Sequence, residues 1–276
     1  MIRQHLKIAL WATSLITVFL LVAVPLFLLF KYSISDTASI NTGGAPIPLW
    51  PFHPTMRNFV YLFSDRHFYD VVLYSALIAG ATVLVSMAIG VPAAYVLARV
   101  PVPGKKTLLL GLISVRLFPD IASVIPISEF FIQINAHNTI WGIVLAHTLL
   151  ALPYVIFIGI SAFEPIPRDL EQQAMVMGAH RFRIFWSVLL PLAIPGLISA
   201  AIYTFLLSWD EFIFSYFLLG LGKISTLTLF LKEKLTSSPP QNLLAAISVC
   251  LSLPVIVFTL LLQKYMTAGV TSGSVK

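Results

Sequence analysis

The sequence predicts an all-α, polytopic membrane protein with about six transmembrane helices. Apolar residues make up 58% of the 276-residue chain and charged residues only 10%, whereas soluble domains have roughly 45–50% and 25%. The mean hydropathy is +0.93. A soluble protein of this length cannot bury so much apolar surface, so lipid must cover part of it.

Six apolar stretches are long enough to cross the roughly 30 Å of hydrocarbon in a bilayer. We expect them to form a single transmembrane domain that occupies residues 1–276. The stretches run over 8–30, 70–98, 107–131, 139–163, 187–217 and 243–263.

The first stretch follows a basic start over residues 1–7. This start resembles a signal peptide, but no small-residue cleavage site closes the apolar run, so we expect an uncleaved first transmembrane helix. A polar segment rich in proline, glycine and asparagine follows near 32–67. It is predicted to be an extracytoplasmic loop, with a short interfacial helix over 58–63.

The second stretch carries small residues at intervals of four, which are Ser86, Gly90, Ala94 and Ala98. Together they make a smooth ridge along one side of a helix, against which a second helix can pack closely. We expect the ridge to serve packing within the bundle rather than a pore.

Charged residues interrupt the third and fifth stretches. Arg116 and Asp120 lie four residues apart on one face of the third, and an intramembrane ion pair should face the bundle or a water-filled cavity. A structural clamp is favoured over a substrate contact. Asp210 and Glu211, late in the fifth stretch, either border an outer cavity or mark the end of the span in water. These four residues are the candidates for a translocation pathway.

Lysine and arginine predict the orientation in the membrane, because they concentrate in cytoplasmic loops. If the N-terminus is inside, ten of the 17 basic residues lie inside, six lie outside and Arg116 lies within the membrane. Both termini are therefore expected to be cytoplasmic. The same bias explains the net charge of +6, and no basic stripe interleaved with aromatics indicates a nucleic-acid partner.

Motifs for catalysis and metal binding are missing from the sequence. Its one cysteine, Cys250, excludes a disulfide framework and a cysteine metal cluster. His137, His147 and His180 are too dispersed to suggest a metal site. The residues at 104–107 lack the earlier glycine of a phosphate-binding loop, and no hydrolase motif is present. We expect no catalytic residue, metal or cofactor in this chain.

The loop 164–186, between the fourth and fifth stretches, predicts a short helix. Asp169 suits an N-cap, and Gln172 completes a capping-box pattern. Gly178 supplies a left-handed stop, and Leu170, Ala174 and Met177 would share one face of the helix. Because a helix of about two and a half turns is marginal alone in water, it must dock on lipid or on a partner protein.

This loop resembles the "EAA" loop of binding-protein-dependent ABC importer permeases. The family pattern is Glu-Ala-Ala, three residues, Gly, nine residues, an aliphatic residue, one residue and Leu-Pro. It is matched here from Gln172 through Gly178 to Val188, Leu190 and Pro191. The sequence departs from the pattern where Gln172 replaces glutamate, Gln173 replaces alanine, and Met177 stands where aspartate is common.

The resemblance implies that the loop is a coupling helix that sits in a cleft of an ATPase subunit. It assigns this role to Asp169, Leu170, Glu171, Gln172, Gln173, Ala174, Met177, Gly178 and Ala179. It also implies the partners: a second homologous permease, two ABC ATPases that use ATP and Mg²⁺, and an extracytoplasmic solute-binding protein. The location implied is the cytoplasmic (inner) membrane.

Two further segments bear on the solute. The tail over 268–276 is similar to the "GLTSGAVKG" ending of carbohydrate-uptake permeases, the class that contains the smaller membrane subunit of the maltose transporter. Residues 208–214, by contrast, resemble polyamine permeases. A sugar, a polyol or a related small solute is therefore the first expectation, and a polyamine or another cation is the alternative.

Two readings from other classes stay open. In an ion-coupled secondary transporter, Arg116, Asp120, Asp210 and Glu211 would form the relay. In a purely structural membrane scaffold, the short loop would bind a partner without transport.

Overall fold

The computed structural model describes residues 2–40, 50–51, 53–220, 222–237 and 239–271, with side chains described between residues 10 and 261. Part of the expected outer loop (41–49) and the end of the carbohydrate-type tail (272–276) lie outside the described residues. Within the described ranges every regular element is a helix, as the sequence predicts. The longest are α1 (Ile2–Ser33), α4 (Arg66–Arg99), α7 (Ile140–Phe163), α10 (Leu190–Trp209) and α13 (Gln241–Thr271). The shorter elements are α2 (Thr37–Ile40), α3 (Arg57–Ser64), α5 (Lys105–Val115), α6 (Asp120–Gln133), α8 (Arg168–Val176), α9 (Arg181–Ile184), the π-helix η1 (Phe185–Leu189), α11 (Ile213–Leu219) and α12 (Leu227–Thr236).

Five helical segments are long and apolar enough to cross a membrane, and a sixth crossing is possible through a bent pair. The five are Leu10–Ser33, Arg66–Arg99, Ile140–Phe163, Arg181–Trp209 and Gln241–Leu261. These lengths support the expected fold of about six spans.

The third expected span, 107–131, differs from the expectation of one helix. It consists of α5 and α6, which meet at an angle of 92°. Proline explains the break, because Pro119 lacks an N–H and disfavours helical geometry in the residue before it. At the end of α5 the backbone hydrogen bonds change to the i→i−3 pattern. The N–H of Arg116 donates to the Ile113 carbonyl (2.9 Å), and the N–H of Leu117 donates to the Ser114 carbonyl (3.1 Å).

The fifth expected span, 187–217, also differs at both ends. Helical structure begins earlier, at Arg181, and passes through the π-turn η1. Pro191 explains that turn, because a proline ring clashes with the carbonyl four residues earlier and a wider turn relieves the clash. The helix then stops at Trp209, and α11 begins separately at Ile213.

The chain divides into two compact units, and the smaller contains residues 1–69 and 231–253. The short helix expected over 58–63 is present in it as α3. The side-chain amides of Asn58, which is half-buried, and Asn242, which is buried, connect segments of this unit by hydrogen bonds. Asn58 Nδ2 donates to the carbonyls of Ser33 (2.8 Å) and Ser35 (3.0 Å). Asn242 Nδ2 donates to Asn58 Oδ1 (3.0 Å) and to the Ser35 carbonyl (3.2 Å). The end of α1 and the starts of α3 and α13 are thereby joined.

The larger unit contains residues 70–230 and 254–276. Its centre is built from α4, α7 and α10, which approach closely through small residues. A Cβ added at Gly90 would lie 2.5 Å from Val155 Cγ1, and one added at Gly159 would lie 2.6 Å from the Cβ of Ala94. The small-residue ridge of α4 therefore packs directly on α7, which confirms its predicted role.

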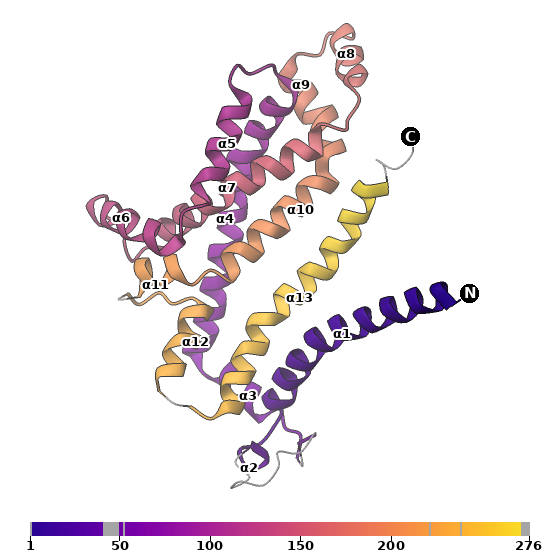
Figure 1. Ribbon diagram of the computed structural model, residues 1–276. Helices are drawn as coiled ribbons and strands as arrows, with labels where there is room; N and C mark the ends of the chain where they lie inside the picture. The colour runs from indigo at the N-terminus through magenta and orange to yellow at the C-terminus, as the bar shows by residue number, and fades with distance from the viewer. Residues whose placement is uncertain (1, 41–49, 52, 221, 238, 272–276) are drawn as a thin grey trace. The chain divides into compact units, whose positions relative to one another are not determined.

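Two apolar clusters place the polar sites at opposite ends of this unit. At one end Phe163, Phe185 and Leu189 are buried, and the Tyr95 ring contacts Phe163 and Phe185 at centroid distances of 5.8 and 5.0 Å. The second cluster includes Val124 of α6 and Phe214 of α11. Figure 1 shows α8 and α9 beyond one end of α7, with α6 and α11 toward its other end.

Candidate functional site

The loop helix α8 begins at Arg168, two residues earlier than an N-cap at Asp169 predicts. Pro167, with extended backbone (ψ 134°), precedes Arg168, and no side chain caps the helix. The expected capping box of Asp169 and Gln172 is therefore not formed. Pro167 occupies the N-cap position instead, and Asp169 lies in the first turn, where a carboxylate is favourable to the helix dipole.

The end of α8 agrees with the prediction. Gly178 has φ +83°, in the left-handed region. Its N–H donates to the Met175 carbonyl (2.9 Å), and the N–H of Ala179 donates to the Ala174 carbonyl (3.0 Å). This pair of bonds is a Schellman closure, which reverses the chain and leads it into α9.

Arg99, the last residue of α4, fastens α8 to the bundle. Its Nη2 donates to the carbonyls of Phe163 (2.6 Å) and Ile166 (2.7 Å), which lie at the end of α7 and in the turn that follows. Its Nε lies 3.1 Å from Glu171 Oε1 of α8, and the exposed fractions of the two side chains are 4% and 16%. One guanidinium thus joins three segments, and a pocket of about 160 Å³ lies beside it, lined also by Arg168 and Arg181.

The two sides of α8 have opposite character. Ala174 is buried and Leu170 is packed against the same apolar cluster, whereas Gln172 and Gln173 are exposed. Val176 and Met177 are 89% and 81% exposed. The expectation that Met177 shares the face of Leu170 and Ala174 is wrong, because the helix ends at Val176 and the chain turns there. The result is an apolar tip on a helix with a fixed base.

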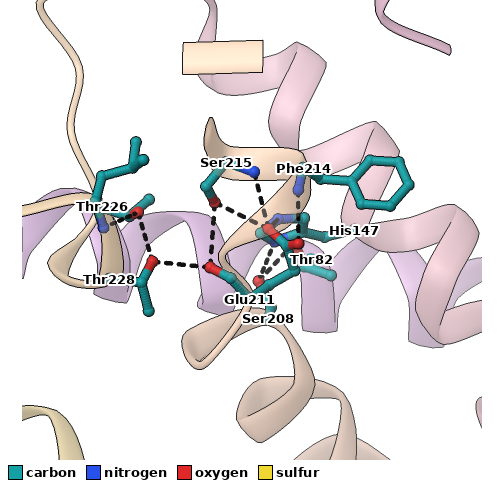
Figure 2. A network of polar contacts seen from close by, with 9 residues as sticks. Thr82, His147, Ser208, Glu211, Phe214, Ser215, Thr226 and Thr228 are labelled. Atoms are coloured by element: carbon teal, nitrogen blue, oxygen red, sulfur yellow. Dashed lines mark hydrogen bonds and ion pairs between the residues drawn. The ribbon is translucent and has the colours of Figure 1, made fainter. Parts of the chain in front are cut away.

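A second polar group lies inside the larger unit, at the other end of α7 and α10 (Figure 2). His147 of α7 is fully buried. Its Nδ1 lies 2.7 Å from Ser208 Oγ and its Nε2 lies 3.1 Å from Glu211 Oε2. Since a carboxylate only accepts, Nε2 carries a proton. Ser208 Oγ in turn lies 3.4 Å from Thr82 Oγ1 of α4.

Glu211 is the centre of this group. Its carboxylate accepts from the backbone N–H of Phe214 (2.7 Å) and of Ser215 (2.9 Å), the first turn of α11. Its backbone carbonyl accepts from Thr228 Oγ1 (2.9 Å). The group therefore joins α4, α7, α10 and α11, and we call Thr82, His147, Ser208 and Glu211 the histidine cluster.

The structure separates two carboxylates that are adjacent in sequence. Asp210 is exposed, whereas the Glu211 side chain is 9% exposed and bound to His147. The oxygens of Glu211 are thus committed to protein partners.

The expected ion pair between Arg116 and Asp120 forms, with Arg116 Nη1 3.1 Å from Asp120 Oδ1. It spans the break between α5 and α6 rather than one continuous helical face. The guanidinium lies over the Tyr154 ring at 5.7 Å. Among the described residues, no recorded interaction links this pair to Asp210 or Glu211.

Comparisons with known proteins show the family of the chain. A family model described as "Binding-protein-dependent transport system inner membrane component" matches residues 90–272. The trehalose transport system permease protein SugB of Mycobacterium tuberculosis is 31% identical over 255 residues, which are 91% of this chain and 92% of that protein. The chain belongs to this family of inner membrane transport components.

Other relatives of this permease share most of its length. The sulfoquinovosyl glycerol transport system permease protein SmoH of Agrobacterium fabrum is 30% identical to this chain. The alignment covers 84% of this chain and 81% of SmoH. In the crystal structure of a bacterial ABC transporter involved in the import of alginate, one chain matches with a TM-score of 0.81 at 22% identity, over 95% of the permease and 98% of that chain. That last likeness supports the fold alone.

Two functional candidates of the permease were missed by sequence reasoning. The sequence gives Arg99 no role beyond a cytoplasmic basic residue at the end of a span that fits the permease family, and it gives His147 no role beyond one of three dispersed histidines. Each acts through partners more than 60 residues away in sequence. Arg99 is one of several basic residues at the ends of spans, and His147 is a single histidine in an apolar helix. No motif or spacing in the sequence therefore predicts their partners.

Proposed function

We propose that this permease imports a saccharide or a related small solute, as one membrane subunit of an ATP-driven importer. Its relatives support a saccharide: SugB is named a trehalose permease, and SmoH is named for sulfoquinovosyl glycerol. The matched chain of the solved structure belongs to an alginate importer. The partners are a second permease, two ABC ATPases and an extracytoplasmic solute-binding protein, and ATP and Mg²⁺ are bound by the ATPases.

The observation that carries the mechanism is the construction of α8. Its base is fixed to α4 and α7 by the buried Arg99, while the tip presents Val176 and Met177 to a partner. Exposed apolar side chains on a rigid helix suit insertion into a cleft. When the ATPases close, they displace the tip, and the fixed base transmits that displacement to the long helices.

The role of α8 also defines the orientation that we propose. The ATPases act in the cytoplasm, so α8 faces the cytoplasm and both chain termini lie on that side. The ion pair that the family pattern would place between α8 and the ATPase is replaced by apolar contact, because Glu171 is bound to Arg99 within the chain. This docking surface includes Gln172 and Gln173, which are exposed.

Structural observations weigh against two alternatives. An importer of polyamines would use Asp210 and Glu211 as a paired acidic site, but the carboxylate oxygens of Glu211 are occupied by His147 and by the backbone N–H groups of Phe214 and Ser215. An ion-coupled relay needs contact between the Arg116–Asp120 pair and the acidic residues, and none is recorded within the described part of the chain.

Reconstitution tests the proposal. The complete complex is placed in proteoliposomes with its binding protein, and uptake and ATPase activity are measured with trehalose, maltose, diacetylchitobiose and spermidine. We expect one of the saccharides to stimulate ATPase activity and to be taken up with ATP but without an ion gradient. Stimulation by spermidine alone, or uptake that requires a gradient and no ATP, would contradict the proposal.

A further inference from the structure

Four polar and aromatic side chains meet where the third span is broken. Arg116 follows the last residue of α5, Asp120 begins α6, Tyr154 lies on α7 and Tyr203 lies on α10. Arg116 pairs with Asp120 at 3.1 Å and lies over the Tyr154 ring at 5.7 Å. The rings of Tyr154 and Tyr203 are 4.8 Å apart at an interplanar angle of 52°. We call these residues the tyrosine–arginine cluster.

The cluster lies near the middle of the helices that carry it. Arg116 follows the 11 residues of α5, or about 16 Å of helix at 1.5 Å per residue. Tyr154 lies nine residues before the end of α7 at Phe163, or about 14 Å. Half of the hydrocarbon thickness is about 15 Å, so the charged pair lies close to the centre of the bilayer.

A charged pair at this depth cannot face lipid. The side chains of Arg116 and Asp120 are 20% and 38% exposed in the single chain. Because exposure of ionised groups to hydrocarbon is costly, this open side must face water or another protein. Discontinuous helices near the bilayer centre are also where transporters place their binding sites.

The chemistry of the cluster suits a saccharide. Arg116 lies over the Tyr154 ring, so the half-buried Tyr203 ring is the one that offers a flat apolar face on which the C–H groups of a pyranose ring can pack. A guanidinium has five N–H donors; the ion pair with Asp120 uses Nη1 and Nε is buried, so the donors left for hydroxyl oxygens are on the two Nη atoms. The Asp120 carboxylate accepts from hydroxyl groups. Few polar groups among aromatic rings are typical of sites for small polar ligands.

We propose that Arg116, Asp120, Tyr154 and Tyr203 contact the saccharide as it passes through the membrane. The inference rests on the proposed function and adds a contact site within this subunit. Tyr203 provides a ring face to the sugar, Arg116 binds its hydroxyl oxygens, and Asp120 holds the guanidinium and accepts from a hydroxyl group.

The test uses the reconstituted complex and whichever of trehalose, maltose and diacetylchitobiose the wild-type protein takes up best. Tyr203→Leu removes the ring, and Tyr203→Phe keeps it. We expect Tyr203→Leu to lower uptake by about tenfold, the usual size of one lost contact, while ATPase stimulation by the loaded binding protein stays within about twofold. Tyr203→Phe should keep more than about a third of wild-type uptake. Arg116→Gln should act like Tyr203→Leu.

The matched control is Tyr95→Leu, because Tyr95 is a half-buried tyrosine in the same unit whose ring packs on Phe163 and Phe185. Loss of packing there should lower uptake and ATPase stimulation together. Tyr203→Trp keeps an aromatic face and tests the site if Tyr203→Leu does not assemble; it should alter uptake and leave stimulation intact.

Equal loss of uptake and stimulation in the Tyr203 and Arg116 variants, or no change in either, overturns the inference and leaves the proposed function standing. A wild-type complex that only spermidine stimulates, or whose uptake requires an ion gradient and no ATP, overturns the proposed function and the inference with it.

Discussion

Arg99 and Glu171 form a buried ion pair, 3.1 Å between Nε and Oε1, that joins the end of α4 to the helix α8. The same guanidinium donates to the Phe163 and Ile166 carbonyls. A flexible loop that a partner displaces would deform without moving the helices, whereas a helix fixed at its base transmits the displacement to them. The pair therefore supports the proposed coupling role of α8, because it fixes the base of this short helix to the end of α4.

Removal of Arg99 should uncouple the transporter. Arg99→Met leaves the buried Glu171 without its ion-pair partner, which costs about 3–5 kcal/mol, so α8 should detach from α4. We expect uptake per ATP hydrolysed to fall by about tenfold, a barrier change near 1.4 kcal/mol. The measurements are the thermal midpoint in detergent and the ratio of uptake to hydrolysis. Lys105→Gln is the control, because the Lys105–Glu164 pair is exposed and worth about 0–1 kcal/mol. Equal coupling in both variants would refute the role of Arg99.

A side chain at Gly178 should strain the backbone, because this residue has a left-handed conformation. Gly178→Leu forces a branched residue to φ +83°, at a cost of roughly 1–2 kcal/mol, and it opens the Schellman closure. We expect weaker copurification of the ATPase and lower uptake. Gly104→Leu is a matched control, because Gly104 also has positive φ (74°) and open space around it but lies outside α8. Unchanged ATPase assembly and uptake in Gly178→Leu would sink the coupling hypothesis.

A charge at the tip of α8 should block docking without unfolding the chain. Val176 is 89% exposed, so Val176→Asp should change the stability of the isolated permease by no more than about 0.5 kcal/mol. Burial of the carboxylate in an apolar cleft is unfavourable, so ATPase copurification should drop at least about tenfold. Met56→Asp is the control, since Met56 is 61% exposed in the smaller unit. Normal ATPase binding by Val176→Asp would show that the tip does not dock.

The histidine cluster should contribute to stability through its hydrogen bonds. His147→Ala removes both ring contacts, leaves Ser208 and Glu211 short of a partner, and opens a cavity. We expect a loss of about 2–4 kcal/mol, measured as a lower thermal midpoint. Thr148→Val is the neighbouring control, because the buried Thr148 hydroxyl has no hydrogen-bond partner within the described residues and its removal should be neutral or stabilising. A similar thermal midpoint for His147→Ala and Thr148→Val would show that the hydrogen bonds of the histidine cluster do not stabilise the protein.

Local patterns in the sequence predicted most elements correctly. Hydropathy located the spans, small residues at intervals of four located the ridge of α4, and Gly178 located the end of α8. The sequence was a weaker guide to helix starts and breaks near proline, which changes the backbone geometry of neighbouring residues. Pro119 divides the third span, Pro167 is the N-cap of α8 in place of Asp169, and Pro191 accompanies the π-turn. Hydropathy averages over such positions and does not register a change in backbone geometry.

By itself, the sequence determined that this chain is a helical membrane protein, and the EAA-like loop with its spacing to Pro191 indicated the transporter family. Both properties depend on residues close together in the chain. Only the tertiary structure decided that Arg99 holds Glu171, that Glu211 binds His147 rather than forming an acidic site with Asp210, and that Tyr154 and Tyr203 meet beside Arg116. The physical reason is that a charged side chain in an apolar bundle needs a partner, and helix packing brings that partner from a distant segment of the chain.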